Sequence, residues 1–185
     1  KSNSSDQMVQ GGVVHIYKSG STPVNGSTSG SWAPVCVITS SHPIHNGPRF
    51  GASVSLGLGN KHVVIGEPEG IRGGAGAGTG SVQIWRFKDD GTKVHVQTIT
   101  NPVTTEKNYF GAFVSATPSW ISISRPVSGN DSDDNDAEGN RAVLVYSSGS
   151  SPGTFALAHT LTRDPNFTSY YGGNTGKWVD AIGNI

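Results

Sequence analysis

The feature that most constrains the fold is an internal repeat of about sixty residues. The segment FGASVS at 50–55 returns as FGAFVS at 110–115, and a looser aromatic–glycine pair, Tyr-Gly, follows at 171–172. Self-similarity at a fixed period is the signature of architectures that stack one supersecondary unit several times. We therefore expect one unit used repeatedly rather than a single continuous core.

Each repeat also carries the pattern of short strands. Two kinds of apolar run recur in the same order, one ending on an aromatic residue (13–17, 82–85, 143–146) and one ending on threonine (35–39, 96–100, 158–162). No segment shows helical periodicity with caps, and 26 glycines and 10 prolines supply frequent turns. Four short strands, named A to D in chain order, are predicted for each repeat, which is the pattern of a β-propeller blade.

The positions of these runs define a frame of blades. The chain is predicted to be all-β, with propeller-like blades of four antiparallel strands, about two of them whole and two in part. Residues 12–39 form a partial blade, 50–100 and 110–162 form whole blades, and 171–185 form the first strand of a further blade, all within one propeller segment, 1–185. Propellers typically have four to eight blades. We therefore expect the remaining blades in the same or another chain, with at least two further repeats.

The stretches FGASVS, VVIGEPEG and GSVQIW resemble the FG-GAP repeat of integrin α-chain propellers, named for a Phe-Gly at its start and a Gly-Ala-Pro near its middle. The residues that carry the resemblance are Phe50, Gly51, Gly66, Pro68, Phe110, Gly111 and Pro126. Glu67 replaces the alanine of the second signature, and the second copy keeps only the proline of that signature. The resemblance implies an extracellular propeller that serves adhesion and protein recognition.

The signature residues are predicted to be structural. A phenylalanine at the start of an inner strand fills the wedge between two blades, and its burial contributes about 2–3 kcal/mol. The glycine beside it permits a positive φ or a close backbone approach. A proline after strand B ends the hydrogen-bond ladder at that point. We therefore assign these positions no chemistry.

An acidic cluster between 130 and 139 is the polar segment that points most clearly to a binding site. Its closely spaced carboxylates, followed by glycine, are the ligand types of a calcium-binding loop. They are Asp131, Asp133, Asp134, Asp136 and Glu138. A solvated flexible loop and a partner-binding loop are the alternatives. In FG-GAP repeats the calcium loop joins strands A and B, but here the A–B connections at 57–60 and 116–119 carry no carboxylate. The family's metal site therefore does not carry over, and calcium is the one cofactor that the sequence suggests.

Four N-glycosylation acceptors indicate a secreted or cell-surface protein. They lie in polar, turn-like surroundings: Asn3, Asn25, Asn130 and Asn166. Cys36 is the only cysteine, so no internal disulfide can form. Its apolar neighbours predict an inert, partly buried thiol.

Charge and motifs argue against several function classes. The formal net charge is +0, so the basic footprint of a nucleic-acid partner is missing. No run approaches the ~20 apolar residues of a membrane span, and no nucleophile-elbow or metalloprotease motif occurs. The glycine-rich stretch 69–80 precedes a strand, whereas phosphate-binding loops precede a helix.

We therefore expect a non-catalytic extracellular module for adhesion, recognition or structural assembly. Its protein or glycan partner is expected on the face where the B–C loops, 69–80 and 127–140, and the D–A loops emerge. The alternatives are the propeller part of a secreted hydrolase and a carbohydrate-binding propeller. In the latter, aromatic residues such as Trp32, Trp120 and Trp178 would line sugar sites.

Overall fold

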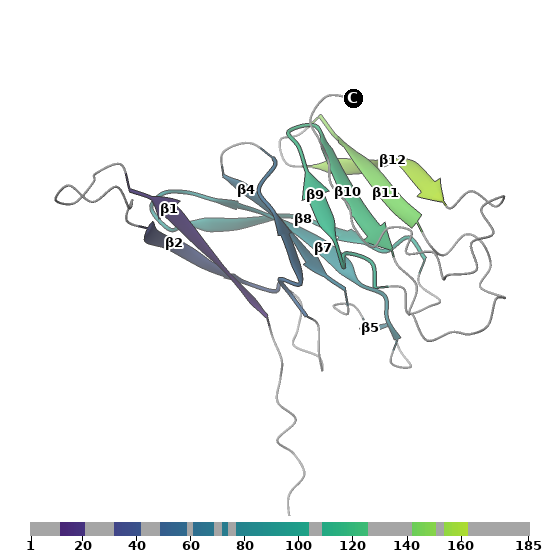
Figure 1. Ribbon diagram of the computed structural model, residues 1–185, viewed down its shortest axis with the longest axis horizontal. Helices are drawn as coiled ribbons and strands as arrows, with labels where there is room; N and C mark the ends of the chain where they lie inside the picture. Colours follow the sequence, from purple (N-terminus) through teal and green to yellow (C-terminus); the bar gives the residue numbers. More distant parts are fainter. Residues whose placement is uncertain are drawn as a thin grey trace, which may run out of the picture.

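A computed structural model describes residues 12–20, 32–41, 49–58, 61–68, 72–73, 77–103, 109–125, 142–150 and 154–162. All regular structure in these residues is β-strand (Figure 1). The strands are β1 (Val13–Ser19), β2 (Trp32–Thr39), β3 (Ser53–Ser55), β4 (His62–Glu67), β5 (Arg72–Gly73), β6 (Ala77–Gly78), β7 (Ser81–Phe87), β8 (Lys93–Thr100), β9 (Val114–Ala116), β10 (Trp120–Arg125), β11 (Ala142–Ser148) and β12 (Phe155–Thr162).

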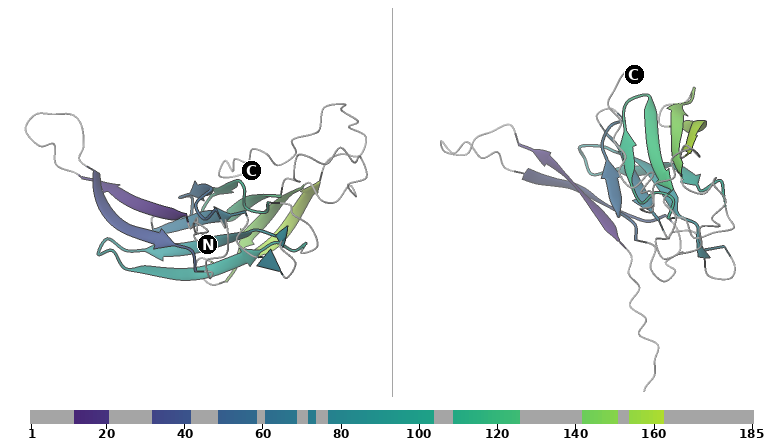
Figure 2. Two further views of the ribbon diagram at one scale, coloured as in Figure 1. Left: turned by 90° about the horizontal axis from the view of Figure 1, so that it is seen from below. Right: turned by 45° about the vertical axis from the view of Figure 1, so that its right-hand side comes forward.

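The strands form antiparallel meanders that follow one another across the molecule (Figure 1; Figure 2). Two sheets have four strands, in the orders β3-β4-β7-β8 and β12-β11-β10-β9, and we call them the first and the second whole blade. β1 and β2 form a two-stranded sheet, which we call the half blade. The predicted all-β fold with propeller-like blades of four antiparallel strands is confirmed.

The hairpins made by strands C and D share one irregularity. The register shifts between Ile16 and Tyr17 in β1, between Ile84 and Trp85 in β7, and between Val145 and Tyr146 in β11. In each case the bulge directly precedes the aromatic residue that ends the apolar run. A β-bulge increases local twist, and its shared place in the three hairpins shows which positions of the three sheets correspond.

The Phe-Gly signature forms the same tight turn in both whole blades. Ala52 N donates to Arg49 O at 3.0 Å, and Ala112 N donates to the corresponding Tyr109 O at 2.9 Å. The glycine at the third position of each turn has a positive φ, 86° at Gly51 and 89° at Gly111. A turn with this geometry strongly favours glycine there, because a Cβ would strain the backbone.

The hydrophobic core lies between the sheets, in two separate clusters. We call the contact between the half blade and the first whole blade the first junction; its buried residues are Val14, Ile16, Ile38, Phe50, Val63 and Ile65. The second junction joins the two whole blades; its buried residues are Val64, Val82, Ile84, Ile99, Phe110, Val114, Ala116, Ile121, Ile123, Ala142, Leu144, Tyr146 and Phe155. The phenylalanine of each Phe-Gly turn is therefore a wedge between two sheets.

The inner strands β3 and β9 also touch directly. Ser53 Oγ donates to Gly111 O at 2.9 Å, and Ala116 N donates to Ser55 Oγ at 3.0 Å. A Cβ on Gly66 would lie 2.0 Å from Gly111 O. This position therefore requires glycine because the backbone of the next blade occupies the side-chain space.

The structure differs from the sequence prediction in detail. The glycine-rich stretch 69–80, expected as a loop, contains the paired strands β5 and β6, which form a small antiparallel sheet. β2 begins at Trp32, before the apolar run that predicted it, because its register with β1 continues to Ser19. The segment 171–185 and Pro126 lie outside the described residues.

Candidate functional site: the loop face

Strand ends of all three sheets meet on one side of the molecule, which we call the loop face. β4, β8 and β10 end there, while β7 and β11 begin there, as the pairings of Ser81 with Glu67 and Thr100 and of Arg125 with Ala142 require. The segment after β2 is hydrogen-bonded to the end of β4, which aligns neighbouring sheets on this side. The B–C and D–A connections therefore leave the blades on the same face.

Glu67, at the end of β4, is a fully buried carboxylate with 0% of its surface exposed. Its Oε1 accepts a hydrogen bond from Ser40 Oγ at 2.6 Å. Its Oε2 accepts hydrogen bonds from Ser81 Oγ at 3.0 Å and from Gln83 Nε2 at 2.9 Å. Burying a carboxylate is costly unless several donors satisfy it. Since Ser40 follows β2, the bonds also tie the half blade to the first whole blade.

Gln83, in the middle of β7, extends this network across the first junction. Its Oε1 accepts hydrogen bonds from Ser41 N at 3.2 Å, from Ser41 Oγ at 3.0 Å and from Trp85 Nε1 at 3.0 Å. Its Nε2 donates to Ser40 Oγ at 3.0 Å as well as to Glu67. The Glu67–Gln83 network therefore fixes where the connection after β2 leaves the sheet.

The second junction fills the corresponding positions differently. Arg125 stands in the place of Glu67, and Leu144 stands in the place of Gln83. Asn101, the first residue after β8, is 2% exposed; its Nδ2 donates to Thr79 O at 2.9 Å and its Oδ1 accepts from Val103 N at 3.0 Å. The connection after β8 is therefore also held in place, by a side-chain amide instead of two serines.

Tyr146 marks the electrostatic character of the second junction. Burial raises the pKa of Tyr146 to about 12, and the positive charge of Arg125 opposes part of that rise. Desolvation disfavours the phenolate, whereas a nearby cation favours it. The phenol therefore stays neutral at physiological pH and acts as an apolar side chain with a polar tip.

The Glu67–Gln83 network is a set of hydrogen bonds that connects two sheets. Both Ser40 and Ser81 direct a hydroxyl proton to the Glu67 carboxylate, inside the protein. Nucleophilic catalysis needs a hydroxyl beside a base and open to substrate. Burial raises the pKa of the Cys36 thiol, with Lys93 opposing the rise. Within the described ranges, no group of three His, Cys, Asp or Glu side chains is placed to hold a metal ion.

Most of the predicted site residues lie beyond the described parts of the chain. These are the acidic residues Asp131, Asp133, Asp134, Asp136 and Glu138, the glycosylation acceptors Asn3, Asn25, Asn130 and Asn166, and Trp178. The acidic residues belong to the connection between β10 and β11, which starts at the loop face. Of the tryptophans, Trp32 is 69% exposed and Trp120 is 40% exposed.

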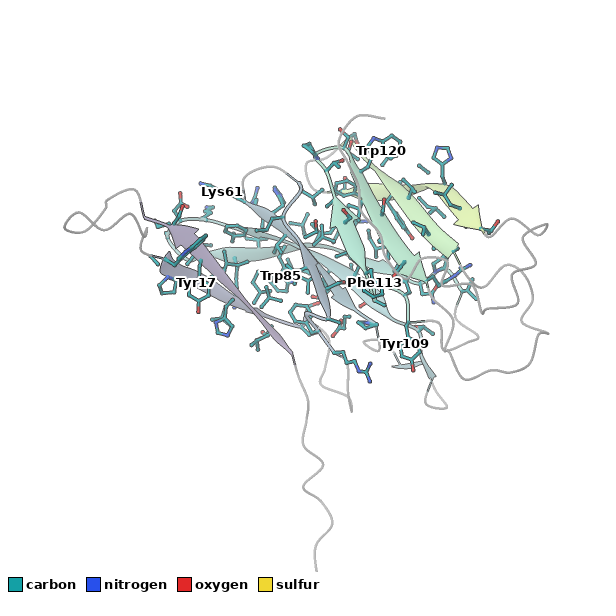
Figure 3. The ribbon with its side chains drawn as sticks, in the orientation of Figure 1. Tyr17, Lys61, Trp85, Tyr109, Phe113 and Trp120 are labelled. Carbon is teal, nitrogen blue, oxygen red and sulfur yellow. The ribbon has the colours of Figure 1, made fainter. Side chains whose placement is uncertain are left out.

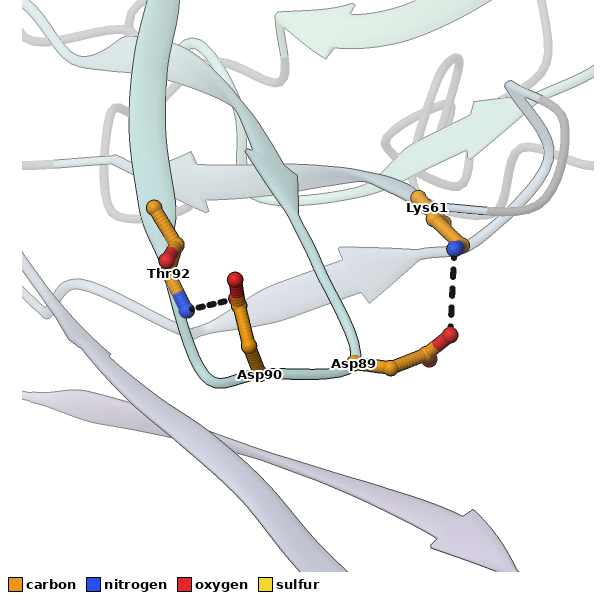
Figure 4. Close-up of polar contacts among 4 residues, drawn as sticks. All are labelled: Lys61, Asp89, Asp90 and Thr92. Carbon is orange, nitrogen blue, oxygen red and sulfur yellow. Dashed lines mark hydrogen bonds and ion pairs between the residues drawn. The ribbon is translucent and has the colours of Figure 1, made fainter.

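On the opposite side of the molecule, a tight turn joins β7 to β8. Gly91 N donates to Lys88 O at 3.0 Å, and Thr92 N donates to Asp90 Oδ1 at 2.8 Å (Figure 4). The hydrogen bonds from Thr92 lower the pKa of the Asp90 carboxyl. Lys61 Nζ forms an exposed ion pair with Asp89 Oδ2 at 3.1 Å (Figure 4). This turn is short, and its backbone amides bond to acceptors within the turn itself. The connections of the loop face are longer.

Sequence reasoning missed the Glu67–Gln83 network. Two signals were present: Gln83 interrupts the apolar run SVQIW, and Glu67 takes the place of a small residue in the Gly-x-Pro signature. A polar residue inside a buried strand requires a partner. The partners, Ser40 and Ser41, come from another repeat, so the pairing needed the structure.

A scan against protein-family models finds no match to this chain, and a search of curated proteins finds none either. The described residues include no helix long and apolar enough to cross a membrane. The likeness to FG-GAP repeats therefore stays a prediction from the Phe-Gly and Gly-x-Pro signatures, and the confirmed statement is the all-β, blade-built architecture.

Proposed function

We propose that this chain is a non-catalytic extracellular module that serves adhesion, recognition or structural assembly, in the manner of an FG-GAP propeller. The observation that carries the proposal is the loop face. There the bases of adjacent connections are fixed by hydrogen bonds to buried groups: Ser40 and Ser41 bond to the buried side chains of Glu67 and Gln83 after β2, and the buried Asn101 bonds to Thr79 O after β8. Long connections on a rigid scaffold are where recognition usually occurs.

The acidic connection between β10 and β11 is the proposed contact region. Carboxylates at Asp131, Asp133, Asp134 and Asp136 would attract a cationic patch on a protein partner or bind calcium. We also expect glycans at Asn25 and Asn166, which would fit an extracellular location. We propose calcium as a ligand of this connection only, because the FG-GAP metal position between strands A and B has no carboxylate in this sequence.

The proposal is tested by binding to a panel of purified extracellular-matrix proteins and arrayed glycans, with and without calcium. Replacing the four aspartates by asparagine is expected to weaken binding while leaving the melting temperature nearly unchanged. Replacing residues 21–31 by a Gly-Ser linker, on the opposite face, is the matched control and is expected to leave binding intact. Binding that survives the first change and is lost with the second would show that recognition occurs on the opposite face.

A carbohydrate-binding role is the second candidate, and the exposure of Trp32 and Trp120 favours it. An exposed indole provides the flat apolar surface on which a sugar ring packs. In this case Trp120→Ala or Trp32→Ala should abolish binding to the glycan array, whereas the aspartate variant should not. A secreted hydrolase that contains this segment remains the alternative from the enzyme class, and we assign no described residue to such a reaction.

A further inference from the structure

The burial of strand C differs among the three sheets. In the first whole blade, which lies in the middle, β7 buries residues 81–84 on both of its faces. In the half blade, β1 buries Val14 and Ile16 and exposes the residues that alternate with them, Val13, His15 and Tyr17. In the second whole blade, β11 leaves Val143 and Val145 only partly buried while their neighbours are buried. The middle sheet is therefore covered on both faces, whereas each outer sheet is covered on one.

The uncovered face of the second whole blade, which we call the downstream face, has the chemistry of a junction. It consists of Trp120, Val143, Val145, His159 and Leu161. Leu161 corresponds to Ile38 and Ile99, which are 0% and 4% exposed because the next sheet covers them, but Leu161 itself is 56% exposed. Beside it, the Trp120 ring stacks on His159, with ring centroids 6.5 Å apart.

The uncovered face of the half blade, which we call the upstream face, consists of Val13, Tyr17 and Trp32. Tyr17 is 51% exposed, whereas the corresponding Tyr146 is 6% exposed. Trp32 is 69% exposed, whereas Phe155, which begins the corresponding strand, is 6% exposed. Tyr17 lies on the half blade and Trp120 on the second whole blade, with the first whole blade between these two sheets (Figure 3), so one copy cannot bring its own two faces together.

The second junction shows how two such faces fit. There Gln97, in the position of His159, donates its Nε2 to Phe155 O at 2.9 Å and accepts from Phe155 N through Oε1 at 2.7 Å. Ile99, in the position of Leu161, belongs to the same buried cluster as Tyr146. A downstream face therefore matches an upstream face, with Leu161 against Tyr17 and His159 against Trp32.

We propose that a second copy of this chain binds head to tail, with the downstream face of one copy on the upstream face of the next. The contact is heterologous, because two different surfaces meet. It is formed mainly by strands C and D of the two outer sheets, β1 and β2 on the upstream face and β11 and β12 on the downstream face, while strand B contributes Trp120 to the downstream face. The inference is independent of the proposed function, since the loop face takes no part in the contact.

Sedimentation equilibrium over a concentration series tests the proposal with the full chain. The wild type is expected to show a mass that rises with concentration. Leu161→Asp and Tyr17→Asp should each weaken association at least about tenfold, because an unpaired carboxylate would be buried in the contact. Val94→Asp is the matched control: Val94 is 42% exposed on the middle sheet, and its replacement should leave association unchanged. Circular dichroism confirms that each variant is folded.

Mixing the two variants gives the decisive result. Leu161→Asp keeps its upstream face and Tyr17→Asp keeps its downstream face, so an equimolar mixture should form a one-to-one dimer. A wild type that stays monomeric at every concentration would overturn the proposal. So would a mixture that stays monomeric while the wild type associates, because that result indicates like faces binding each other.

Discussion

The two junctions differ in the side chains at their loop-face ends. The first junction has Glu67 and Gln83 there, whereas the second has Arg125 and Leu144 in the corresponding positions. The surrounding backbone is alike in both: the same Phe-Gly turn, the same bulge and the same antiparallel order. The repeat therefore conserves the turn and the wedge, while the side chains between the wedges vary in charge. Blade packing depends on the turn and the wedge. The local chemistry of each connection depends on the side chains that vary.

Removing a wedge should have the largest effect. Phe50 is 3% exposed and Phe110 is 0% exposed, each in its own junction. Phe50→Ala and Phe110→Ala should each lower the free energy of unfolding by about 3–5 kcal/mol, through lost burial and a cavity. Urea denaturation measures this, with Val54→Ala, an exposed position, as control. A loss below about 1 kcal/mol for one of the two would break the equivalence of the junctions.

Exchanging the polar and apolar side chains at corresponding positions of the two junctions should have an intermediate effect on the free energy of unfolding. Gln83→Leu removes the acceptor of Ser41 and Trp85 and one donor to Glu67, which should cost about 1–3 kcal/mol. Leu144→Gln places an amide in the apolar second junction and should cost a similar amount. The same urea experiment decides. If both variants are as stable as the wild type, glutamine and leucine are interchangeable at this position, and the proposed difference between the two junctions is wrong.

Alkaline pH should affect the second junction through Tyr146. Its pKa is raised from 10.0 to about 12 in the folded protein, so the unfolded chain loses this proton first. The stabilising contribution is present below pH 10 and falls as pH rises from 10 towards 12. In Tyr146→Phe this part of the pH dependence should disappear. An unchanged alkaline profile in that variant would show that Tyr146 is as solvated as a free phenol.

The exposed ion pair outside both junctions should have the smallest effect. Lys61 and Asp89 side chains are 49% and 65% exposed, so solvent screens their attraction. Lys61→Met should change the free energy of unfolding by less than about 1 kcal/mol. A larger loss would mean that the turn between β7 and β8 also stabilises the junctions. That result would contradict the claim that Phe50 and Phe110 contribute most to blade packing.

The sequence predicted the blades because their determinants are local and repeated. Phe50 and Phe110 recur with similar neighbours, and the runs ending at Trp85 and Tyr146 are short and mostly apolar, as buried strands are. The loop-face network was not predictable, because Glu67 and Gln83 bond to Ser40 and Ser41 across a junction. The pairing of β5 with β6 was missed because their glycines carry no apolar alternation. Residues 130–139, the predicted acidic site, lie outside the described part, so that prediction stays open to the binding experiment.

Amide hydrogen exchange at Gly51 and Gly111 tests most directly whether one repeated wedge joins the blades. Gly51 N donates to Gly66 O, and Gly111 N donates to Ser124 O, each at 3.0 Å, so both bonds lock a Phe-Gly turn beneath a junction. We predict strong and similar protection at the two amides, and loss of protection at Gly111 in Phe110→Ala. Exchange at unfolded-chain rates at either amide in the wild type would contradict the claim that the same wedge joins both pairs of sheets.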